Sequence, residues 1–412
     1  MRIEEYKREI WTCNHCAMCT GTVTDEGGFY KTCPTYEQLR FEDSSSRGHN
    51  IMAFYLLEGS LKYSKEVADC VYNCTTCASC EEICKPMGNM IAQMGGSALK
   101  TLLPRIMRPL GAELEPIQSV AIVEAMRADC VDLGLQPEPL KKMAGSIEKN
   151  YNPYGAPHAN RTKWAEGLDI PQTADTVLFV GCSIAYSRQE IAHATLKILK
   201  RAGIKFAVLP DEWCCGSILL RNGNVDLAEK MITHNVDLLK EKKVKRLVTS
   251  CAEGYMGISK DWPQLAGELP FKVLHISQLL AELISGGKIK FKKPINSKVT
   301  YHDPCHLGRE MDIYDEPRVV LKSIPGIDLV EMYPTEHAAW CCGAGGGVKI
   351  ANPELALDIG AAKIPFIKET GATVLASACP FCKTHFMDVM ERAKETIEVK
   401  DITELVAEAM GV

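Results

Sequence analysis

The sequence predicts an α+β to α/β multidomain protein, in which a mostly helical module precedes two repeated α/β domains with parallel sheets. Three observations predict this. Closely spaced cysteines fall in two runs before residue 100, one pattern of strands, helices and cysteines occurs twice after residue 172, and a stretch rich in proline and polar turns lies between. We expect the helical module over 1–100, a helical connector over 101–172, and the repeats over 173–295 and 296–412.

The composition is that of an ordinary globular protein with one anomaly. Hydrophobic residues make up 46% of the chain, and the net charge of −5 gives no reason to expect a nucleic acid partner. We find no apolar run of the roughly 18–20 residues that a membrane span needs. The N-terminus does not resemble a signal peptide, so we expect a cytoplasmic protein, membrane-associated only through a partner subunit. The anomaly is the 19 cysteines, which in a reducing compartment indicate metal ligation.

The helical module carries two copies of the C-x2-C-x2-C spacing of bacterial two-cluster ferredoxins, in "CNHCAMC" and "CTTCASC". Three thiolates on one tight turn can hold one face of a cubic [4Fe–4S] cluster. In that pattern the distant fourth cysteine of each run completes the other cluster. We therefore expect one [4Fe–4S] cluster on Cys13, Cys16, Cys19 and Cys84, and a second on Cys74, Cys77, Cys80 and Cys33.

Zinc is the competing ligand for these cysteines, but it usually takes two C-x2-C pairs, and a triple run crowds a single ion. The 13 residues between Cys19 and Cys33 make a longer spacer than small ferredoxins have, so Cys33 is assigned less firmly than Cys84. Two cysteines remain outside the motifs. We expect Cys70 and Cys130 to be buried structural thiols, although Cys70 could also face the second cluster.

After the connector, each repeat begins with a buried strand that ends at a cysteine, "TVLFVGCS" and "KVTYHDPCH". A helix, a short strand ("KFAVLP"; "IDLVEMY"), a "WCCG", a second helix and a third strand ("RLVTSC"; "TVLASAC") follow in each copy. Strands that alternate with helices indicate a parallel sheet. Because ligands of open α/β sheets bind beyond the carboxyl ends of the strands, we expect the cysteines of each copy to converge on one pocket.

The adjacent cysteines of "WCCGAGGGVKI" point in divergent directions, which suits a cluster of several irons better than one tetrahedral ion. The glycines that follow can adopt positive φ and let backbone N–H groups approach cluster sulfurs. A dinucleotide-binding loop is the alternative, but it should follow a strand directly and has no cysteine pair. The residues expected to form this loop are Cys341, Cys342, Gly343, Gly345, Gly346 and Gly347.

The spacing C-x35-CCG-x35-C-x2-C in the second repeat resembles the cysteine-rich CCG domain of the heterodisulfide reductase family. Residues 10–400 as a whole resemble its D-type subunit. The resemblance implies a noncubane [4Fe–4S] assembly of two fused halves, which cleaves the mixed disulfide of coenzyme M and coenzyme B in a step that closes methanogenesis. The implied ligands are Cys305, Cys341, Cys342, Cys379 and Cys382.

The first repeat departs from this pattern, because Gly254 stands where the second repeat has Cys382. The remaining set could hold an iron–sulfur cluster, zinc or nothing. We therefore expect the second repeat to be reactive and the first to be a relay or a structural site. The cysteines of the first repeat are Cys182, Cys214, Cys215 and Cys251.

Disulfide reduction needs two electrons, which iron–sulfur clusters deliver singly, and an iron with an exchangeable position could hold the half-reduced sulfur between the two steps. We expect electrons to come from a redox partner (a membrane cytochrome, a flavoprotein or a ferredoxin-type protein) and to reach Cys305 through the N-terminal clusters. His306 is the preferred proton donor, and His302 fits a structural place at a strand end equally well. Arg309, Lys349 and Lys383 are candidate contacts for an anionic thiol or disulfide substrate, or surface charges.

Two other functions remain open. Similar chains are iron–sulfur electron-transfer subunits of glycolate or lactate oxidases, which accept electrons from a flavoprotein and do not cleave a disulfide. Others belong to a dsr-type membrane complex that acts on a sulfur-carrier trisulfide. The complete set of five cysteines in the second repeat favours chemistry at a disulfide or polysulfide.

Overall fold

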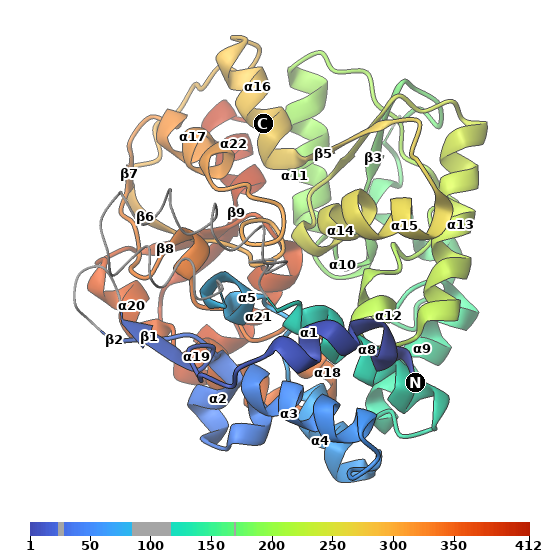
Figure 1. Cartoon of the computed structure of the whole chain (residues 1–412). Helices are drawn as coiled ribbons and strands as arrows, with labels where there is room; N and C mark the ends of the chain where they lie inside the picture. The colour runs from blue at the N-terminus through green and yellow to red at the C-terminus, as the bar shows by residue number, and fades with distance from the viewer. Residues whose placement is uncertain (24–28, 85–116, 169) are drawn as a thin grey trace, which may run out of the picture.

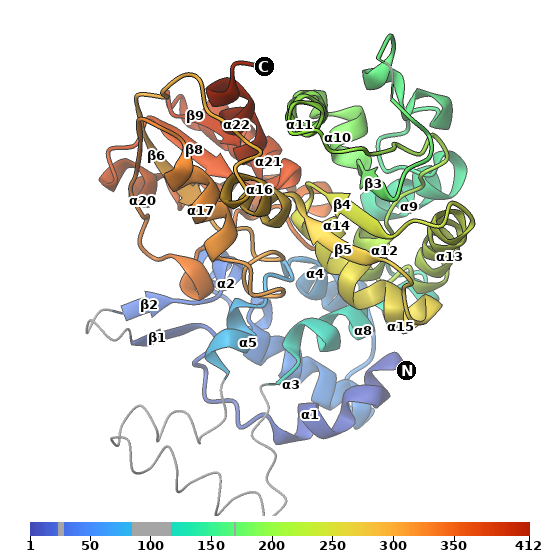
Figure 2. The same cartoon turned by 90° about the horizontal axis from the view of Figure 1, so that it is seen from above.

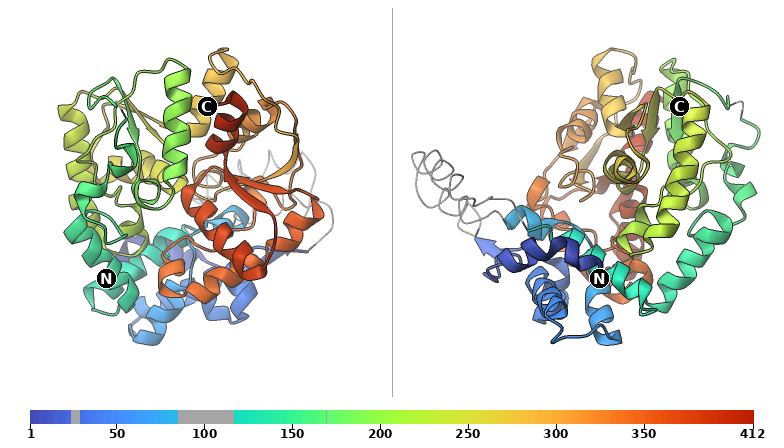
Figure 3. Two further views of the ribbon diagram at one scale, coloured as in Figure 1. Left: turned by 180° about the vertical axis from the view of Figure 1, so that it is seen from behind. Right: turned by 45° about the vertical axis from the view of Figure 1, so that its right-hand side comes forward.

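The computed structural model describes residues 1–23, 29–84, 117–168 and 170–412. The predicted connector therefore lies partly outside the described residues. Two α/β units stand side by side, and the N-terminal module lies beneath both of them (Figure 1; Figure 3, left). This confirms the predicted class, in which a mostly helical module precedes a repeated α/β architecture. No helix within the described ranges is long and apolar enough to cross a bilayer.

The N-terminal module is built from short helices around one small apolar core. Polar side chains begin its longer helices, since Ser45 accepts from the N–H of Gly48 and Ser64 from the N–H of Val67. The elements are η1 (Arg2–Tyr6), α1 (Lys7–Thr12), β1 (Gly21–Val23), β2 (Phe29–Lys31), α2 (Pro34–Leu39), η2 (Glu42–Ser44), α3 (Ser46–Leu57), α4 (Lys65–Tyr72) and α5 (Ser79–Ile83).

The described part of the connector begins with α8 (Ser119–Asp132) and α9 (Glu138–Asn150). Helix α8 packs against α3, α4 and η1, and Ile122 and Met126 join the apolar core of the N-terminal module. The stretch that follows contains only the short turns η4 (His158–Asn160) and η5 (Lys163–Ala165). The connector is therefore helical where it adjoins the cysteine module and irregular where it reaches the first repeat.

The first repeat has a three-stranded parallel sheet in the order β3 (Thr176–Phe179), β4 (Arg246–Thr249), β5 (Lys272–His275). The predicted strand "KFAVLP" is wrong as a full strand, because it forms only an isolated bridge from Ala207 to Val177. The helices are α10 (Cys182–Tyr186), α11 (Gln189–Arg201), α12 (Ser217–Arg221), α13 (Val225–Glu241), α14 (Ala252–Met256), α15 (Trp262–Ala266) and α16 (Ile276–Ser285), with the π-helical turn η6 (Gly257–Asp261).

The second repeat has a four-stranded parallel sheet in the order β7-β6-β8-β9, whose last strand the sequence pattern does not reveal. Here the predicted "IDLVEMY" strand does pair with its neighbour, over Ile327–Leu329. The elements are β6 (Ser297–His302), α17 (Asp315–Ser323), β7 (Ile327–Leu329), η7 (Glu336–Ala338), α18 (Val348–Ala351), α19 (Pro353–Ala361), α20 (Ile364–Glu369), β8 (Val374–Ser377), α21 (Pro380–Ala393), β9 (Glu398–Asp401) and α22 (Ile402–Met410).

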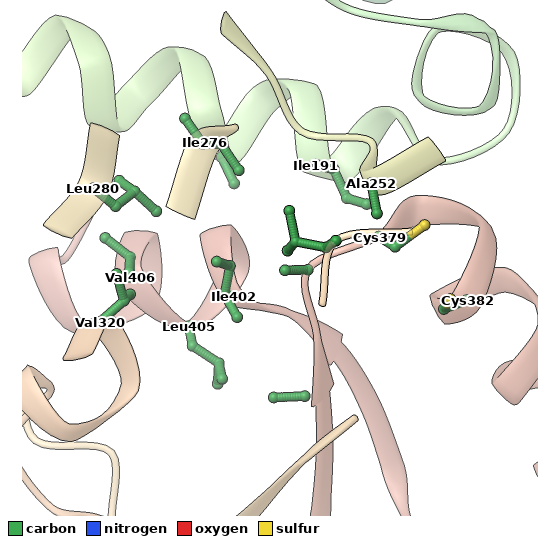
Figure 4. Close-up of a cluster of buried hydrophobic side chains, with 14 of the residues drawn as sticks. Ile191, Ala252, Ile276, Leu280, Val320, Cys379, Cys382, Ile402, Leu405 and Val406 are labelled. Carbon is green, nitrogen blue, oxygen red and sulfur yellow. The ribbon is translucent and has the colours of Figure 1, made fainter. Parts of the chain in front are cut away.

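The two repeats share one apolar core across their interface. Helix α11 packs on α22 and α16 on α17, which brings buried side chains of both repeats together (Figure 4). Burial of side chains such as Ile276, Leu280 and Leu405 contributes about 1.5–3 kcal/mol each, so the two repeats form a joint unit. Figure 2 shows the N-terminal module against both repeats.

Candidate metal centre

All 19 cysteines of the chain are free thiols. Most of them gather along one line of contacts that runs from the N-terminal module into the two repeats. Only Cys70 and Cys130 lie apart, and Cys70 is partly exposed, so the expectation of a buried thiol is wrong for Cys70 and holds for Cys130. The Cys70 thiol is 3.4 Å from the carboxylate of Asp43, and Cys130 is fully buried in an apolar cluster.

The two C-x2-C-x2-C loops of the N-terminal module have the same unusual backbone. The second and fourth residues after the leading cysteine have positive φ in both: His15 at 55° and Ala17 at 66°, then Thr76 at 48° and Ala78 at 58°. Residues other than glycine rarely adopt this conformation, and such strained backbone collects at functional sites. The shared conformation bends each loop so that its three thiols can face one point.

The four cysteines of the first group, Cys13, Cys16, Cys19 and Cys84, lie near one another. Burial raises the pKa of Cys19 to about 12, with Cys13 and Cys84 acting in the same direction. Cys13 ends α1 and Cys84 ends α5, so a helix end positions each outer member of the group. Buried thiols with raised pKa values keep their protons until a metal cation replaces them, which is the chemistry of a cysteine-ligated cluster.

The second group consists of Cys33, Cys74, Cys77 and Cys80, and all four line one cavity. Burial also raises the pKa of Cys80 well above its ordinary value, and the thiols of Cys77 and Cys74 add to the effect. Four thiols around one cavity fit a [4Fe–4S] cluster. The pairing of Cys33 with the later triplet, which the long spacer leaves less firmly assigned, agrees with this arrangement.

The five cysteines of the second repeat form a continuous cluster of buried thiols. Cys305 hydrogen bonds with Cys341, the neighbouring Cys342 lies 3.5 Å from Cys382, and Cys382 contacts Cys379. Cys305 follows β6 and Cys379 follows β8, so the ends of adjacent parallel strands bring them together. This thiol-rich, desolvated donor set fits an assembly of several irons.

The glycines after the doublet act in two ways. The N–H of Gly343 lies 3.3 Å from the Cys341 sulfur and donates to it. Gly345 and Gly346 instead pack against the second ferredoxin loop, where an added Cβ would meet the carbonyl oxygens of Thr75 and Cys74 at 2.6 Å. The glycines therefore allow the second repeat to lie directly against the N-terminal module.

Contact between the N-terminal module and the second repeat is also made by thiols. Cys77 of the second ferredoxin group hydrogen bonds with Cys341 of the doublet. Arg309 holds the same seam, because its Nε donates to the Cys77 carbonyl at 2.7 Å and its Nη1 to the Ala339 carbonyl at 2.6 Å. The second ferredoxin group and the second repeat are thus neighbours without intervening structure.

In the first repeat, Cys182, Cys214 and Cys215 lie together. The hydrogen bond with Cys214 and the nearby Arg161 guanidinium, 3.3 Å from the Cys182 sulfur, lower the pKa of Cys182 to about 7. Arg161 is a buried cation, held in an ion pair with Glu212, and no motif in the sequence identifies it.

Cys251, the fourth cysteine of the first repeat, contacts Cys379 of the second repeat. Figure 4 shows Ala252, the residue after Cys251, beside Cys379. Cys251 also lies near Cys215 of its own repeat, so one pocket for these cysteines stays a prediction, but the contact with Cys379 joins the two repeats. The cause is the packing of the two sheets, which turns the carboxyl end of β4 toward that of β8.

The predicted proton donor and the three predicted substrate-binding cations differ in how close they lie to the cysteines. His306 is buried, with Nε2 3.3 Å from the Thr76 carbonyl. Lys383 is buried between Glu190 at 2.8 Å and Glu404 at 2.6 Å, and Lys349 pairs with Asp388. Of the three cations predicted to contact substrate, only Arg309 thus adjoins the cysteines, while both lysines are paired with carboxylates.

Sequence reasoning missed a polar pair behind the doublet. The ammonium of Lys363 lies 2.8 Å from Nδ1 of His302 and 2.9 Å from the carbonyl of Trp340. A ring nitrogen of His302 lies within 4.8 Å of the Cys342 and Cys382 sulfurs. Burial lowers the pKa of Lys363 to about 8 and holds that of His302 well below its usual range. The one signal for Lys363 is its place in an otherwise apolar stretch, "AAKIPFI".

Comparison with known families agrees with this arrangement. The cysteine-rich (CCG) domain matches residues 176–259 and 299–387, and the 4Fe-4S dicluster domain matches residues 8–87. The D-type subunit of a dihydromethanophenazine:CoB–CoM heterodisulfide reductase from Methanosarcina barkeri is 38% identical over 408 residues, which cover 97% of this chain and 93% of that protein. An EtfAB:quinone oxidoreductase of Syntrophomonas wolfei is 28% identical over 86% of this chain and 48% of its own length.

Among solved structures, a hypothetical protein from Helicobacter pylori superposes with a TM-score of 0.50 over 89% of this chain and 77% of its own. Its sequence identity of 11% limits the likeness to the fold.

Proposed function

We propose, from the premise that this chain belongs to the family of the D-type subunits of heterodisulfide reductase, that it is the iron–sulfur catalytic subunit of a disulfide-reducing complex. Its substrate in this proposal is the mixed disulfide of coenzyme M and coenzyme B. The reaction takes up two electrons and two protons, breaks one S–S bond and releases two thiols. The observation that carries the proposal is the unbroken line of thiol groups from the N-terminal module to the five cysteines of the second repeat.

The line of thiols supports a defined electron route. Cys19 of the first ferredoxin group lies near Cys80 of the second, and Cys77 touches Cys341 of the second repeat. In this proposal the residues of the N-terminal module hold two [4Fe–4S] clusters, and the five cysteines after β6, η7 and β8 hold a noncubane [4Fe–4S] cluster. When bound, that cluster supplies single electrons and an iron that a substrate sulfur can reach.

The chain itself supplies protons and orientation. His306 donates from Nε2 to the Thr76 carbonyl, which leaves Nδ1 to hold and pass a proton beside Cys305. Glu253 is partly buried near His306, and one of its carboxyl oxygens is buried without a hydrogen-bond partner among the described residues. Arg309, Lys349 and Lys383 remain proposed contacts for an anionic substrate, and the two lysines would have to exchange their carboxylate partners to act in this way.

A second candidate function has a specific observation in its favour. The relative from Syntrophomonas wolfei, 28% identical over 377 residues, is named an EtfAB:quinone oxidoreductase, a name that contains no disulfide substrate. By that comparison, this chain would be the electron-transfer subunit of a complex of the glycolate or lactate oxidase type. Reduction of a sulfur-carrier trisulfide would need the same cysteines as disulfide reduction. The complete second repeat favours chemistry at sulfur.

In this proposal the chain works with an electron-donating partner, which is a membrane cytochrome, a flavoprotein or a ferredoxin-type protein. Association with a membrane would then depend on that partner. The first repeat, with four cysteines and the Arg161–Glu212 pair, is proposed to be a relay or structural site that holds a further iron–sulfur cluster or zinc.

The experiment that tests the proposed function uses anaerobically purified protein. Iron and sulfide are measured first, and electron paramagnetic resonance spectra of the oxidised form are then recorded with and without coenzyme M, coenzyme B and unrelated thiols. A new signal that only one of the two coenzymes produces supports catalysis at sulfur. Spectra that no thiol changes, together with ordinary signals from reduced clusters, would favour the electron-transfer function.

A further inference from the structure

His302 and Lys363 form a buried polar pair directly behind the cysteine doublet. Each side chain is 1% exposed, and His302 ends β6 while Lys363 precedes α20. The Lys363 ammonium donates to His302 Nδ1 and to the carbonyl of Trp340, the residue before the doublet. The pair thus links the strand that leads to Cys305 with the loop that carries Cys341.

The hydrogen bond from Lys363 fixes the tautomer of His302. An ammonium group has only donors, so Nδ1 must accept, and the neutral ring then carries its proton on Nε2. Nε2 has no hydrogen-bond partner among the described residues, although the ring is buried. A buried N–H without a partner is destabilising, and sulfur acceptors are close by, because a ring nitrogen of His302 lies within 4.8 Å of the Cys342 and Cys382 sulfurs.

The charge of Lys363 also needs a partner. The nearest carboxylate, Asp303, is already held by both terminal nitrogens of Arg318 at 2.7 and 2.9 Å. Lys363 makes no hydrogen bond to a carboxylate within the described part of the chain, and besides Asp303 the nearby groups that can carry negative charge are the sulfurs of the doublet. A buried ammonium in such a place is stabilised by negative charge on sulfur.

We propose that His302 donates an Nε2–H···S hydrogen bond to the site of Cys342 and Cys382, and that Lys363 orients the ring and supplies positive charge. Together the two residues favour the reduced form of this site. His302 is then a positioning residue and not a metal ligand. The inference rests on the proposed function only in requiring an iron–sulfur cluster on these cysteines. It requires no particular substrate.

The test compares the full-length, cluster-loaded wild type with Lys363→Met, His302→Leu and His302→Gln. We expect unchanged iron content in all variants. In Lys363→Met and His302→Leu the oxidised-to-reduced ratio of the site at a fixed potential should rise roughly tenfold, the effect of losing one charge-assisted hydrogen bond. His302→Gln keeps an N–H donor and should lie closer to wild type. Lys368→Met, which removes an exposed lysine of α20, is the matched control.

Pulsed paramagnetic resonance of protein labelled with 15N-histidine gives an independent readout. A weak nitrogen coupling that His302→Leu removes is expected for a hydrogen bond. A strong coupling of a directly bound nitrogen, or loss of iron in His302→Leu, would overturn the proposal. So would unchanged potentials in both Lys363→Met and His302→Leu. If the wild-type protein bound no iron, the proposed function would fail as well. The iron content of the wild type is measured before any substitution is made, so the two failures can be told apart.

Discussion

Cys251 and Cys379 are in direct contact, although they belong to different repeats and lie 128 residues apart in the chain. Cys251 follows β4 and Cys379 follows β8, so the contact joins the carboxyl ends of the two sheets. The N–H of Gly254 lies 3.5 Å from the Cys251 sulfur, at the position where the second repeat has its last cysteine. The incomplete repeat therefore presents one of its thiols to the complete one.

Replacement of Cys251 should consequently disturb the site of the second repeat. We expect Cys251→Ser to change the resonance spectrum of that site, because a hydroxyl replaces the thiol that contacts Cys379. The measurement is the spectrum of the oxidised protein together with its iron content. Cys70→Ser is the control, since Cys70 lies outside the line of thiol contacts. Identical spectra for the two variants would contradict the expectation.

The two doublets should differ in their importance for catalysis. Cys341→Ser removes a thiol that contacts both Cys305 and Cys77, so it should abolish disulfide reduction and interrupt the electron route. Cys214→Ser alters the first repeat only and should leave measurable turnover. The assay is coenzyme disulfide reduction with a reduced dye as electron donor. Activity that survives Cys341→Ser but not Cys214→Ser would reverse the assignment of the reactive repeat.

Proton delivery by His306 predicts a selective loss of rate. His306→Gln keeps a donor to the Thr76 carbonyl but cannot pass a proton, so kcat should fall by roughly 100-fold or more while iron content stays constant. His337→Gln, at an exposed histidine of η7, is the matched control. Equal kcat values for the two variants would exclude His306 as the donor.

The sequence predicts what depends on local spacing and misses what depends on packing between domains. The triplets around Cys16 and Cys77 impose a tight loop wherever they occur, and strand patterns before Cys182 and Cys305 indicate parallel sheets. The contact of Cys251 with the other repeat depends instead on α11 packing on α22 and α16 on α17, and no motif encodes this geometry.

Single buried polar residues are missed for a related reason. Lys363 and Arg161 each stand alone in the sequence, and their importance comes from partners that lie far along the chain, His302 and Cys182. The strand "KFAVLP" fails in the first repeat because only Ala207 reaches the sheet edge. The predicted domain boundaries and the remaining site assignments stay predictions.

Arg127 should be essential for the stability of the assembly. Its guanidinium is fully buried and donates to carbonyl oxygens of the N-terminal module and of both repeats, those of Val71, Cys74, Arg221 and Gly346. Arg127→Met leaves these carbonyls without this donor, at about 1–3 kcal/mol for each that finds no other partner. We expect the free energy of unfolding to fall by about 3–5 kcal/mol, as for other broken buried charge contacts.

Chemical denaturation of the anaerobic protein, followed by circular dichroism, measures this loss. Arg40→Met is the control, because Arg40 is exposed and pairs with Glu37 at the surface. Surface ion pairs contribute about 0–1 kcal/mol, so the control should unfold close to wild type. A difference of under about 1 kcal/mol between Arg127→Met and the control would show that neighbouring groups replace the guanidinium.

Asp401 should make the stability of the second repeat depend on pH. Its carboxylate begins α22, with one oxygen accepting from the N–H of Thr403 at 2.9 Å and the other without a partner among the described residues. Burial raises the pKa of Asp401 to about 7, from 3.8 for an unperturbed aspartate. Between those values the folded state binds more protons than the unfolded state, so this residue stabilises the fold increasingly as pH falls from about 7 toward 4.

Asp401→Asn keeps an oxygen acceptor for the helix start and removes the charge, and asparagine begins helices about as well as aspartate does. The variant should therefore unfold at a higher temperature than wild type at pH 8, and this advantage should shrink as pH is lowered to 5, because the wild-type carboxyl is then protonated in the folded state. Melting temperatures of both proteins at the two pH values measure the effect, with Asp328→Asn at an exposed position of β7 as the control. An equal difference between Asp401→Asn and wild type at both pH values would mean that the buried carboxyl does not titrate in this range.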